Sequence, residues 1–187
     1  MTEKALTNRR IALGITGSIA AYKGCELVRR LKEAGADVRV ILTRNAATFV
    51  GEATLLALSG NRVITDLFES ADEWVGDHIS VARWAELLLI APATANIIGK
   101  AASGIADDIL STTILSVPCK VVFAPAMNSA MFQHPAVQYN IAKLRKNGCE
   151  FIPPESGFLA CGEEGIGRLA DVGTILATVV TLLKQPG

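Results

Sequence analysis

The chain has 187 residues, of which 50% are hydrophobic and only 5% aromatic, and its 18 basic and 18 acidic residues leave no net charge. This balance argues against a protein that binds nucleic acid or an anionic membrane, because such proteins usually carry a basic excess. The length suits one full-sized domain, and the abundance of Ala, Ile, Leu and Val is typical of buried parallel strands covered by helices.

The start of the chain and its cysteines indicate neither secretion nor a metal centre. The first ten residues, MTEKALTNRR, are polar and charged, so we expect no signal peptide, and the longest apolar stretch is too short and interrupted to span a bilayer. The four cysteines form no CxxC pair and only two histidines exist, so we expect no zinc site. Cys25, Cys119 and Cys149 lie in apolar patterns and are interpreted as small core residues of a cytoplasmic protein.

The first third of the chain predicts a β-α-β unit. An apolar run over residues 9–16 predicts a strand, and residues 18–36 carry apolar side chains at helical spacing and close on Gly35. Residues 37–43 predict a second strand. The two strands are expected to be parallel and joined by a right-handed crossover.

The same alternation of strands and helices continues to the end of the chain. We expect strands at 62–66, 86–92, 119–125 and 150–154, and helices near 47–59, 79–85, 94–116 (one or two), 135–147 and 171–184. Residues 68–77 and a glycine-rich stretch before the last helix are expected to be loops. With no internal repeat or linker, residues 1–187 predict a single doubly wound α/β domain, Rossmann-like or flavodoxin-like, with a mostly parallel sheet and helices on both faces.

The loops after the first two strands are candidates for binding a nucleotide, because doubly wound sheets bind ligands beyond the carboxyl ends of their strands. Gly14 and Gly17 precede a helix, which suits a phosphate as well as a purely structural turn. An NAD site would need a carboxylate after the second strand, whereas this chain has Thr43 and Arg44. Arg44 leaves NADP open, but a mononucleotide such as FMN fits better.

The loops after two later strands carry further polar side chains. Thr94 and Asn96 follow one strand, and Met127 and Asn128 follow the next. Asparagine at such a position is also a common turn former or helix cap, so each loop alone is ambiguous. Together with the glycine turn, they predict one ligand crevice.

His78 and Arg83 lie at the start of a possible helical turn. His78 is open to two interpretations, a surface loop histidine or a general base, and Arg83 would then clamp a carboxylate or phosphate.

Four segments in this order and at these separations resemble one family: GITGSIAAYK, HISVARWAELLLIAPATAN, FAPAMNSAMF and ACGEEGIGRLA. They resemble the homo-oligomeric flavin-containing cysteine decarboxylases, and most closely the branch that decarboxylates phosphopantothenoylcysteine in coenzyme A biosynthesis. The resemblance covers residues 9 to 184. It implies FMN as cofactor and a homotrimer, or a dodecamer of four trimers, with FMN at subunit interfaces. In bacteria this domain is commonly fused to a phosphopantothenate–cysteine ligase, and the sequence leaves open whether such a ligase domain belongs to this protein.

The resemblance also implies roles for individual residues. His78 would be the catalytic histidine, Arg83 would bind the acidic substrate, and Asn128, with Met127 beside it, would contact the substrate. Cys161 matches a cysteine on a substrate-covering flap at about 155–170. FMN would be held by Gly17, Ser18, Ile19, Thr43, Thr94, Ala95, Asn96, Ile97 and Ala126.

The implied reaction oxidises the substrate thiol to a thioaldehyde, releases carbon dioxide and then reduces the resulting enethiol. His78 would manage the thiol proton, and Cys161 would donate a proton in the final reduction. Peptidyl-cysteine decarboxylases share the FMN site but typically lack the flap cysteine and release the enethiol. Cys161 therefore favours the coenzyme A branch, with a peptide-modifying decarboxylase and a non-catalytic flavin-binding regulatory subunit as alternatives. The glycines at 162, 165 and 167 predict a flexible lid around Cys161.

Overall fold

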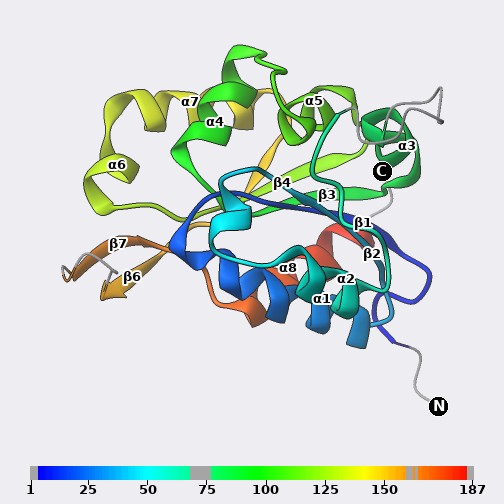
Figure 1. Cartoon of the computed structure of the whole chain (residues 1–187). Helices are drawn as coiled ribbons and strands as arrows, with labels where there is room; N and C mark the ends of the chain where they lie inside the picture. The colour runs from blue at the N-terminus through cyan, green and yellow to red at the C-terminus, as the bar shows by residue number, and fades with distance from the viewer. Residues whose placement is uncertain (1–3, 68–76, 159–161, 163, 185–187) are drawn as a thin grey trace.

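The core of the molecule is a five-stranded sheet in the order β2-β1-β3-β4-β5, with every neighbouring pair parallel (Figure 1). The computed structural model describes residues 4–67, 77–158, 162 and 164–184. The predicted doubly wound α/β fold is confirmed. The strands are β1 (Arg10–Ile15), β2 (Asp37–Leu42), β3 (Leu87–Ala93), β4 (Lys120–Pro125) and β5 (Glu150–Phe151).

Helices cover both faces of this sheet, as the two layers in Figure 1 show. One layer contains α1 (Lys23–Glu33), α2 (Glu52–Ser59) and α8 (Val172–Lys184). The other contains α3 (Asp77–Trp84), α4 (Ala95–Ser103), α5 (Ile109–Ser116) and α7 (Pro135–Lys146). Because both faces are covered, the strands are apolar along nearly their whole length, and all seven residues of β3 are buried.

Each helical layer buries its own apolar cluster against the sheet. On the side of α1 and α8, Leu27, Leu31 and Ile175 pack against alternate residues of the strands. On the other side, Phe123 of β4 is fully buried and stacks on Phe151 of β5 with ring centroids 5.0 Å apart. The two-sided burial explains why the strand pattern in the sequence is continuous rather than alternating.

Four details differ from the expected elements. The strand expected at 62–66 forms only an isolated parallel bridge between Ile41 and Ile64. The helix expected near 47–59 is divided at Gly51 into the short helix η2 (Ala46–Thr48) and α2. A short helix η1 (Ile19–Tyr22) precedes α1, and α6 (Ser129–Gln133) was not predicted because it is a single turn after Asn128.

The glycine-rich stretch near the C-terminus is the largest difference. We predicted a loop, but β6 (Glu155–Phe158) and β7 (Glu164–Arg168) pair as an antiparallel hairpin outside the main sheet, so the prediction is wrong for these residues. Cys161 and its predicted lid position lie outside the described residues.

The hairpin docks on the loop after β4 because two glycines of β7 have no side chain. The Met127 N–H donates to the Gly167 carbonyl oxygen at 3.0 Å, and the Ser129 hydroxyl donates to the Ile166 carbonyl oxygen at 2.6 Å. A Cβ atom on Gly165 would overlap the Ser129 hydroxyl, and one on Gly167 would overlap the Met127 carbonyl oxygen. The glycines therefore permit close packing here.

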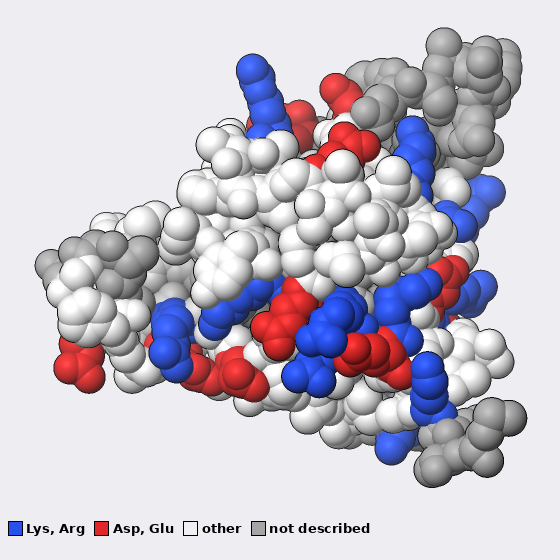
Figure 2. Space-filling model, turned by 60° about the horizontal axis from the view of Figure 1, so that its bottom comes forward, with Lys and Arg blue, Asp and Glu red and all other residues white. Residues whose placement is uncertain are grey.

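Charges of both signs are mixed over the surface layer of α1. Figure 2 shows Lys and Arg alternating with Asp and Glu in a band, beside a broad area without charged side chains. Along α1 these charges include the pairs Arg29–Glu33 and Arg30–Glu26. Among the described residues, no helix combines the length and apolar character needed to cross a membrane.

We predict that Gly167→Ala lowers the free energy of unfolding more than Gly148→Ala. Both glycines have positive φ, +140° and +90°, so each alanine pays a conformational cost of about 1–2 kcal/mol. Nothing lies within 4 Å of a Cβ on Gly148, whereas one on Gly167 meets Met127, which adds about 1–3 kcal/mol. Urea denaturation measures both losses, and amide exchange at Met127 reports the docking. Equal losses would contradict the close approach.

Candidate functional site

A cavity of about 970 Å³ opens at the carboxyl ends of the strands. The strand order reverses between β1 and β3, which is where sheets of this order bind their ligands. Every residue that the resemblance implies for FMN lines this cavity, and so do Met127 and Asn128. The fold therefore brings together side chains from four separate loops that the sequence analysis singled out.

The turn after β1 forms one wall. A Cβ atom on Gly17 would lie 2.6 Å from the Cβ of Asn45, so only glycine allows this turn to approach the segment after β2 so closely. The Ser18 hydroxyl caps η1 by accepting the Ala20 N–H at 3.3 Å. The Thr43 N–H donates to the Ile15 carbonyl oxygen at 3.1 Å, which joins the ends of β1 and β2.

Thr16 connects the turn after β1 to the loop after β3. Its side chain is buried, and its hydroxyl donates to the Pro92 carbonyl oxygen at 2.7 Å while accepting the Thr94 N–H at 3.1 Å. Thr94 in turn caps α4 by accepting the Ile97 N–H at 3.4 Å. The hydroxyl of Thr16 thus fixes the position of the wall that α4 contributes.

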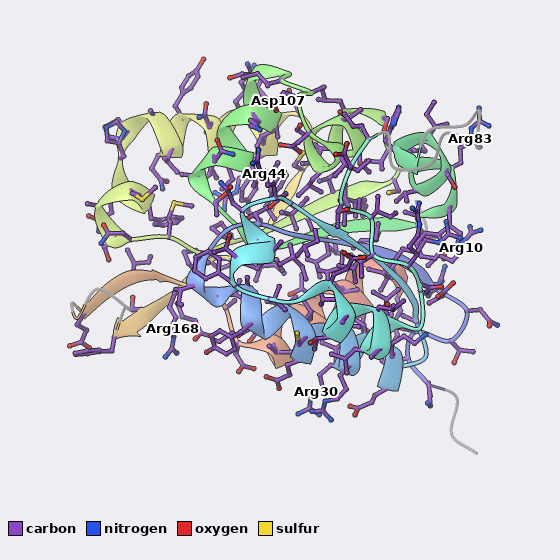
Figure 3. The ribbon with its side chains drawn as sticks, in the orientation of Figure 1. Arg10, Arg30, Arg44, Arg83, Asp107 and Arg168 are labelled. Atoms are coloured by element: carbon purple, nitrogen blue, oxygen red, sulfur yellow. The ribbon has the colours of Figure 1, made fainter. Side chains whose placement is uncertain are left out.

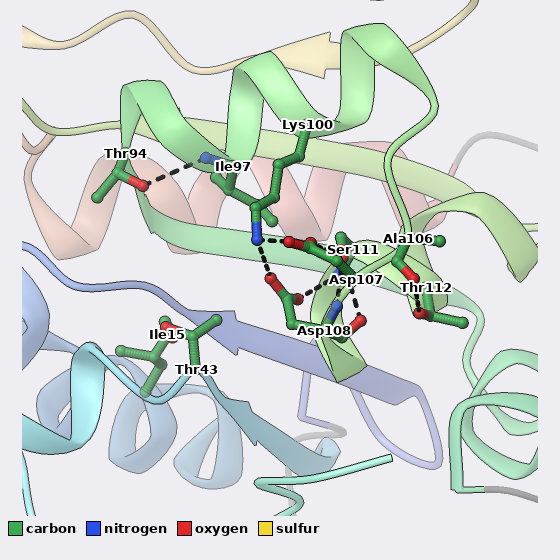
Figure 4. Close-up of polar contacts among 10 residues, drawn as sticks. All are labelled: Ile15, Thr43, Thr94, Ile97, Lys100, Ala106, Asp107, Asp108, Ser111 and Thr112. Atoms are coloured by element: carbon green, nitrogen blue, oxygen red, sulfur yellow. Dashed lines mark hydrogen bonds and ion pairs between the residues drawn. The ribbon is translucent and has the colours of Figure 1, made fainter.

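Lys100 forms an ion cluster with the start of α5 (Figure 4). Its Nζ atom lies 2.6 Å from Oδ1 of Asp107 and 2.6 Å from Oδ2 of Asp108. Asp108 also caps α5, accepting the Ser111 N–H at 2.8 Å, while the Ser111 hydroxyl accepts the Asp108 N–H at 3.1 Å. Lys100 and Asp108 both line the cavity.

Lys100 and Asp108 stay ionised at neutral pH. Burial raises the pKa of the Asp108 carboxyl, but the hydrogen bonds from Lys100 and Ser111 outweigh it and leave that pKa below its usual value. Burial lowers the pKa of Lys100, but its hydrogen bonds to Asp107 and Asp108 leave it above the usual value.

The β6–β7 hairpin and the loop after β4 close the opposite side of the cavity. Asn128 caps α6 by accepting the Ala130 N–H at 2.8 Å. Arg168 lines the cavity, and its guanidinium donates to Oε2 of Glu155 at 2.7 Å. Phe158, at the end of β6, also lines the cavity and is 74% exposed.

His78 and Arg83 are not among the residues that line the cavity. Both lie on α3, and Figure 3 places Arg83 at the opposite side of the molecule from Arg168. His78 is half-buried, and its Nδ1 atom is buried without a hydrogen-bond partner in the described part of the chain. A single copy of the chain therefore does not bring these two side chains to the cavity that it forms.

Sequence reasoning did not assign Lys100, Phe158 or Arg168 to this site. A hydroxyl residue in the glycine turn and an aspartate before an apolar helix are visible signals for Thr16 and Asp108. No rule of residue spacing predicts that Lys100 pairs with Asp108, which lies eight residues later and beyond the end of α4. Among the described residues, no group of three or more His, Cys, Asp or Glu could hold a metal ion.

Comparisons with known proteins agree on the nature of the fold. A family model described as Flavoprotein matches residues 1–184. The chain is 49% identical over 171 residues to the coenzyme A biosynthesis bifunctional protein CoaBC of Bacillus subtilis (strain 168), covering 91% of this chain and 42% of that protein. The chain thus spans less than half the length of the curated relatives it matches.

Two solved structures show how far the likeness extends. A mutant of PPC decarboxylase complexed with pantothenoylaminoethenethiol superposes with a TM-score of 0.86 at 31% identity, covering 95% of this chain and 100% of that one. The FMN-dependent cysteine decarboxylase SpaF gives a TM-score of 0.83 at 32% identity, covering 94% of this chain and 97% of that one.

We predict that Asp108→Asn lowers stability in a pH-dependent way. The folded-state pKa of Asp108 lies below its usual value, so its stabilising contribution is present above the unfolded pKa of about 3.9 and is lost as the pH falls through the folded pKa. At neutral pH we expect the variant to lose about 1–2 kcal/mol of unfolding free energy.

The loss should shrink as the pH falls from the unfolded pKa of about 3.9 toward the lower folded-state pKa of Asp108, because protonated aspartic acid then resembles asparagine. Urea denaturation across this pH range measures it. Glu33→Gln, which breaks only the exposed pairs with Arg29 and Arg30, is the matched control and should change little at any pH. A loss at Asp108 that does not vary with pH would contradict the ionised cluster.

Proposed function

Since this chain belongs to the flavoprotein family, we propose that it is an FMN-dependent carboxy-lyase that converts phosphopantothenoylcysteine to phosphopantetheine in coenzyme A biosynthesis. One observation carries the proposal: the strand-end cavity is lined by every residue that the resemblance implies for FMN together with Met127 and Asn128. The names of its relatives, at 42–49% identity, support the pathway. We propose that residues 1–187 form a single decarboxylase domain.

The residues present fit FMN. The cavity volume lies at the upper end of the range usual for small-molecule sites, about 300–1,000 Å³. Hydroxyls of Ser18, Thr43 and Thr94 suit a polyol and phosphate, while Ala126 and Ile97 offer apolar surface for a ring. FMN, when bound, supplies the two-electron acceptor that takes the substrate thiol to a thioaldehyde and the donor that later reduces the enethiol.

The chain's own residues would bind the substrate and move its protons. The amide of Asn128, beside Met127, contacts the substrate from the end of β4. His78 accepts the proton that the thiol loses as its carbon is oxidised, and the Arg83 guanidinium binds an acidic group of the substrate. Carbon dioxide then leaves because the thiocarbonyl accepts the electron pair. Cys161 donates the proton that the adjacent carbon takes up as hydride returns.

We propose that this site is completed by a second copy of the chain, in a trimer or a dodecamer of four trimers. The support is that His78 and Arg83 lie on α3, away from the cavity of their own chain. Apolar side chains at the cavity are also unusually open: Ile19 is 58%, Tyr22 61% and Met131 49% exposed. A neighbouring subunit that brings α3 to this rim would cover them.

We also propose a partner domain and a cellular location for this protein. Since the relatives are named bifunctional, we propose a fused ligase domain as a functional partner. A cytoplasmic location accords with the free thiols of Cys25, Cys119 and Cys149.

A peptidyl-cysteine decarboxylase is the second candidate, since SpaF, to which the chain is 32% identical, is named an FMN-dependent cysteine decarboxylase without reference to coenzyme A. The two candidates differ in product, because the coenzyme A branch returns a saturated thiol and the peptide branch releases an enethiol. A non-catalytic flavin-binding subunit would give neither product.

The decisive experiment loads the protein with FMN, adds phosphopantothenoylcysteine and identifies the product by mass. We expect phosphopantetheine from the wild type, and flavin retention without carbon dioxide release from His78→Asn. Cys161→Ser should release carbon dioxide and accumulate the enethiol. A protein that cannot be loaded with FMN would contradict the proposal, and loading without turnover would favour the regulatory role.

We predict that two inactive variants complement each other. His78→Asn removes the proposed base, and Asn128→Asp introduces a charge that repels the substrate carboxylate while keeping the oxygen that caps α6. If each site combines α3 of one subunit with the cavity of the next, co-expression restores intact sites, about one in four on random mixing.

Two different tags confirm that mixed assemblies form, and carbon dioxide release measures the recovery. Mixed assemblies without any recovered activity would show that each subunit contains a complete site.

A further inference from the structure

Four cations line the cavity: Lys23, Arg44, Lys100 and Arg168. Asp108 is the one acidic residue among the described residues that line it. The cavity wall therefore carries an excess of positive charge, which the uncharged balance of the whole chain conceals.

Two of these cations are neutralised by neighbouring carboxylates. Lys100 contacts Asp107 and Asp108, and Arg168 contacts Glu155. Their charges are already matched, so an anionic ligand gains little by approaching them. Lys23 and Arg44 have no such ion pair in the described part of the chain.

The two unmatched cations flank the same wall of the cavity. Arg44 stands between Thr43, which is bonded to the end of β1, and Asn45, whose Cβ packs against Gly17. Lys23 follows η1 directly and donates its N–H to the Ala20 and Ala21 carbonyl oxygens. Figure 3 shows Arg44 over the middle of the molecule, far from Arg168. The two unmatched cations thus come from the segments that follow β1 and β2, the same segments that contribute Gly17, Ser18 and Thr43 to the cavity.

We propose that Arg44, assisted by Lys23, recognises a phosphate monoester in this cavity. Two unpaired cations match the charge of a phosphate dianion, and the guanidinium presents paired donors to its oxygens. The proposal rests on the proposed function, in which both FMN and the substrate carry a phosphate monoester. The chemistry is the same for either source, and the two arms of the test distinguish them.

The first arm compares FMN with riboflavin, which lacks the phosphate, by quenching of flavin fluorescence in the wild type and in Arg44→Gln. If the cofactor phosphate occupies the subsite, the variant binds FMN about 10-fold to 100-fold more weakly and riboflavin equally well. The salt dependence of FMN binding should also become shallower. Arg44→Lys, which keeps a point charge, should retain part of the discrimination.

The second arm uses FMN-loaded protein and compares phosphopantothenoylcysteine with its dephosphorylated form. If the substrate phosphate occupies the subsite, Arg44→Gln raises KM about 10-fold or more for the phosphorylated form alone, with FMN affinity unchanged. Lys23→Gln should weaken binding of the same phosphorylated ligand as Arg44→Gln, by a smaller factor.

Arg29→Gln is the matched control, because it removes the same charge from the exposed end of α1 and breaks only the pair with Glu33. Unchanged discrimination in both arms would overturn the phosphate subsite, and so would an equal loss for phosphorylated and dephosphorylated ligands. A wild type that binds no flavin would instead overturn the proposed function, so the two failures are distinguishable.

Discussion

The hydroxyl of Thr16 occupies the point at which the strand order reverses, and the geometry of the cavity depends on it. A parallel sheet diverges there, because the crossover after β1 runs to one face and that after β3 to the other. Two loops that separate in this way would leave buried backbone groups without partners. Thr16 satisfies both, donating to Pro92 and accepting from Thr94. The side chain that completes the core therefore also sets the distance between two walls of the site.

The second constraint is the contact between the hairpin and the loop after β4. Gly165 and Gly167 let the backbone of β7 approach the Met127–Ser129 segment until main-chain groups meet. Two carbonyl oxygens of β7 accept hydrogen bonds, one from the Met127 N–H and one from the Ser129 hydroxyl, so a shift in register would break both bonds together. Asn128 and the base of the predicted flap therefore behave as one unit.

Sequence patterns predicted the parallel sheet and both helical layers because burial on two faces produces long apolar runs that no other arrangement explains as simply. They failed at the hairpin for a definable reason. A glycine can serve either a flexible backbone or the close approach of two backbone segments. The amino-acid sequence alone does not show which of the two applies. Gly167 serves the second use, and its partner Met127 lies forty residues earlier in the chain.

The candidate site was predictable where it follows strand ends and unpredictable where it depends on pairs across elements. Gly17, Thr94 and Asn128 were found because their positions in the β-α units place them at one edge of the sheet. The pairing of Lys100 with Asp108 was missed because it needs the turn between α4 and α5 to fold back. The catalytic role of His78 stays a prediction, because His78 lies on α3 and is not among the residues that line the cavity of its own chain.

The distribution of charge makes the two sides of the cavity electrostatically different. Near β3, β4 and the hairpin, the cations are matched by carboxylates, and apolar surface from Ile97 and Ala126 lies among them. On the segments that follow β1 and β2, the cations are unmatched and hydroxyls are frequent. A ligand with a flat apolar end and an anionic end binds favourably in only one orientation in such a cavity. In the opposite orientation its charged end would lose its hydration against the apolar wall. In that orientation the apolar end of the ligand would lie on the side of β3 and β4, the side from which Asn128 comes. The wall that we propose to recognise the anion would then also determine which atoms of the ligand face Asn128.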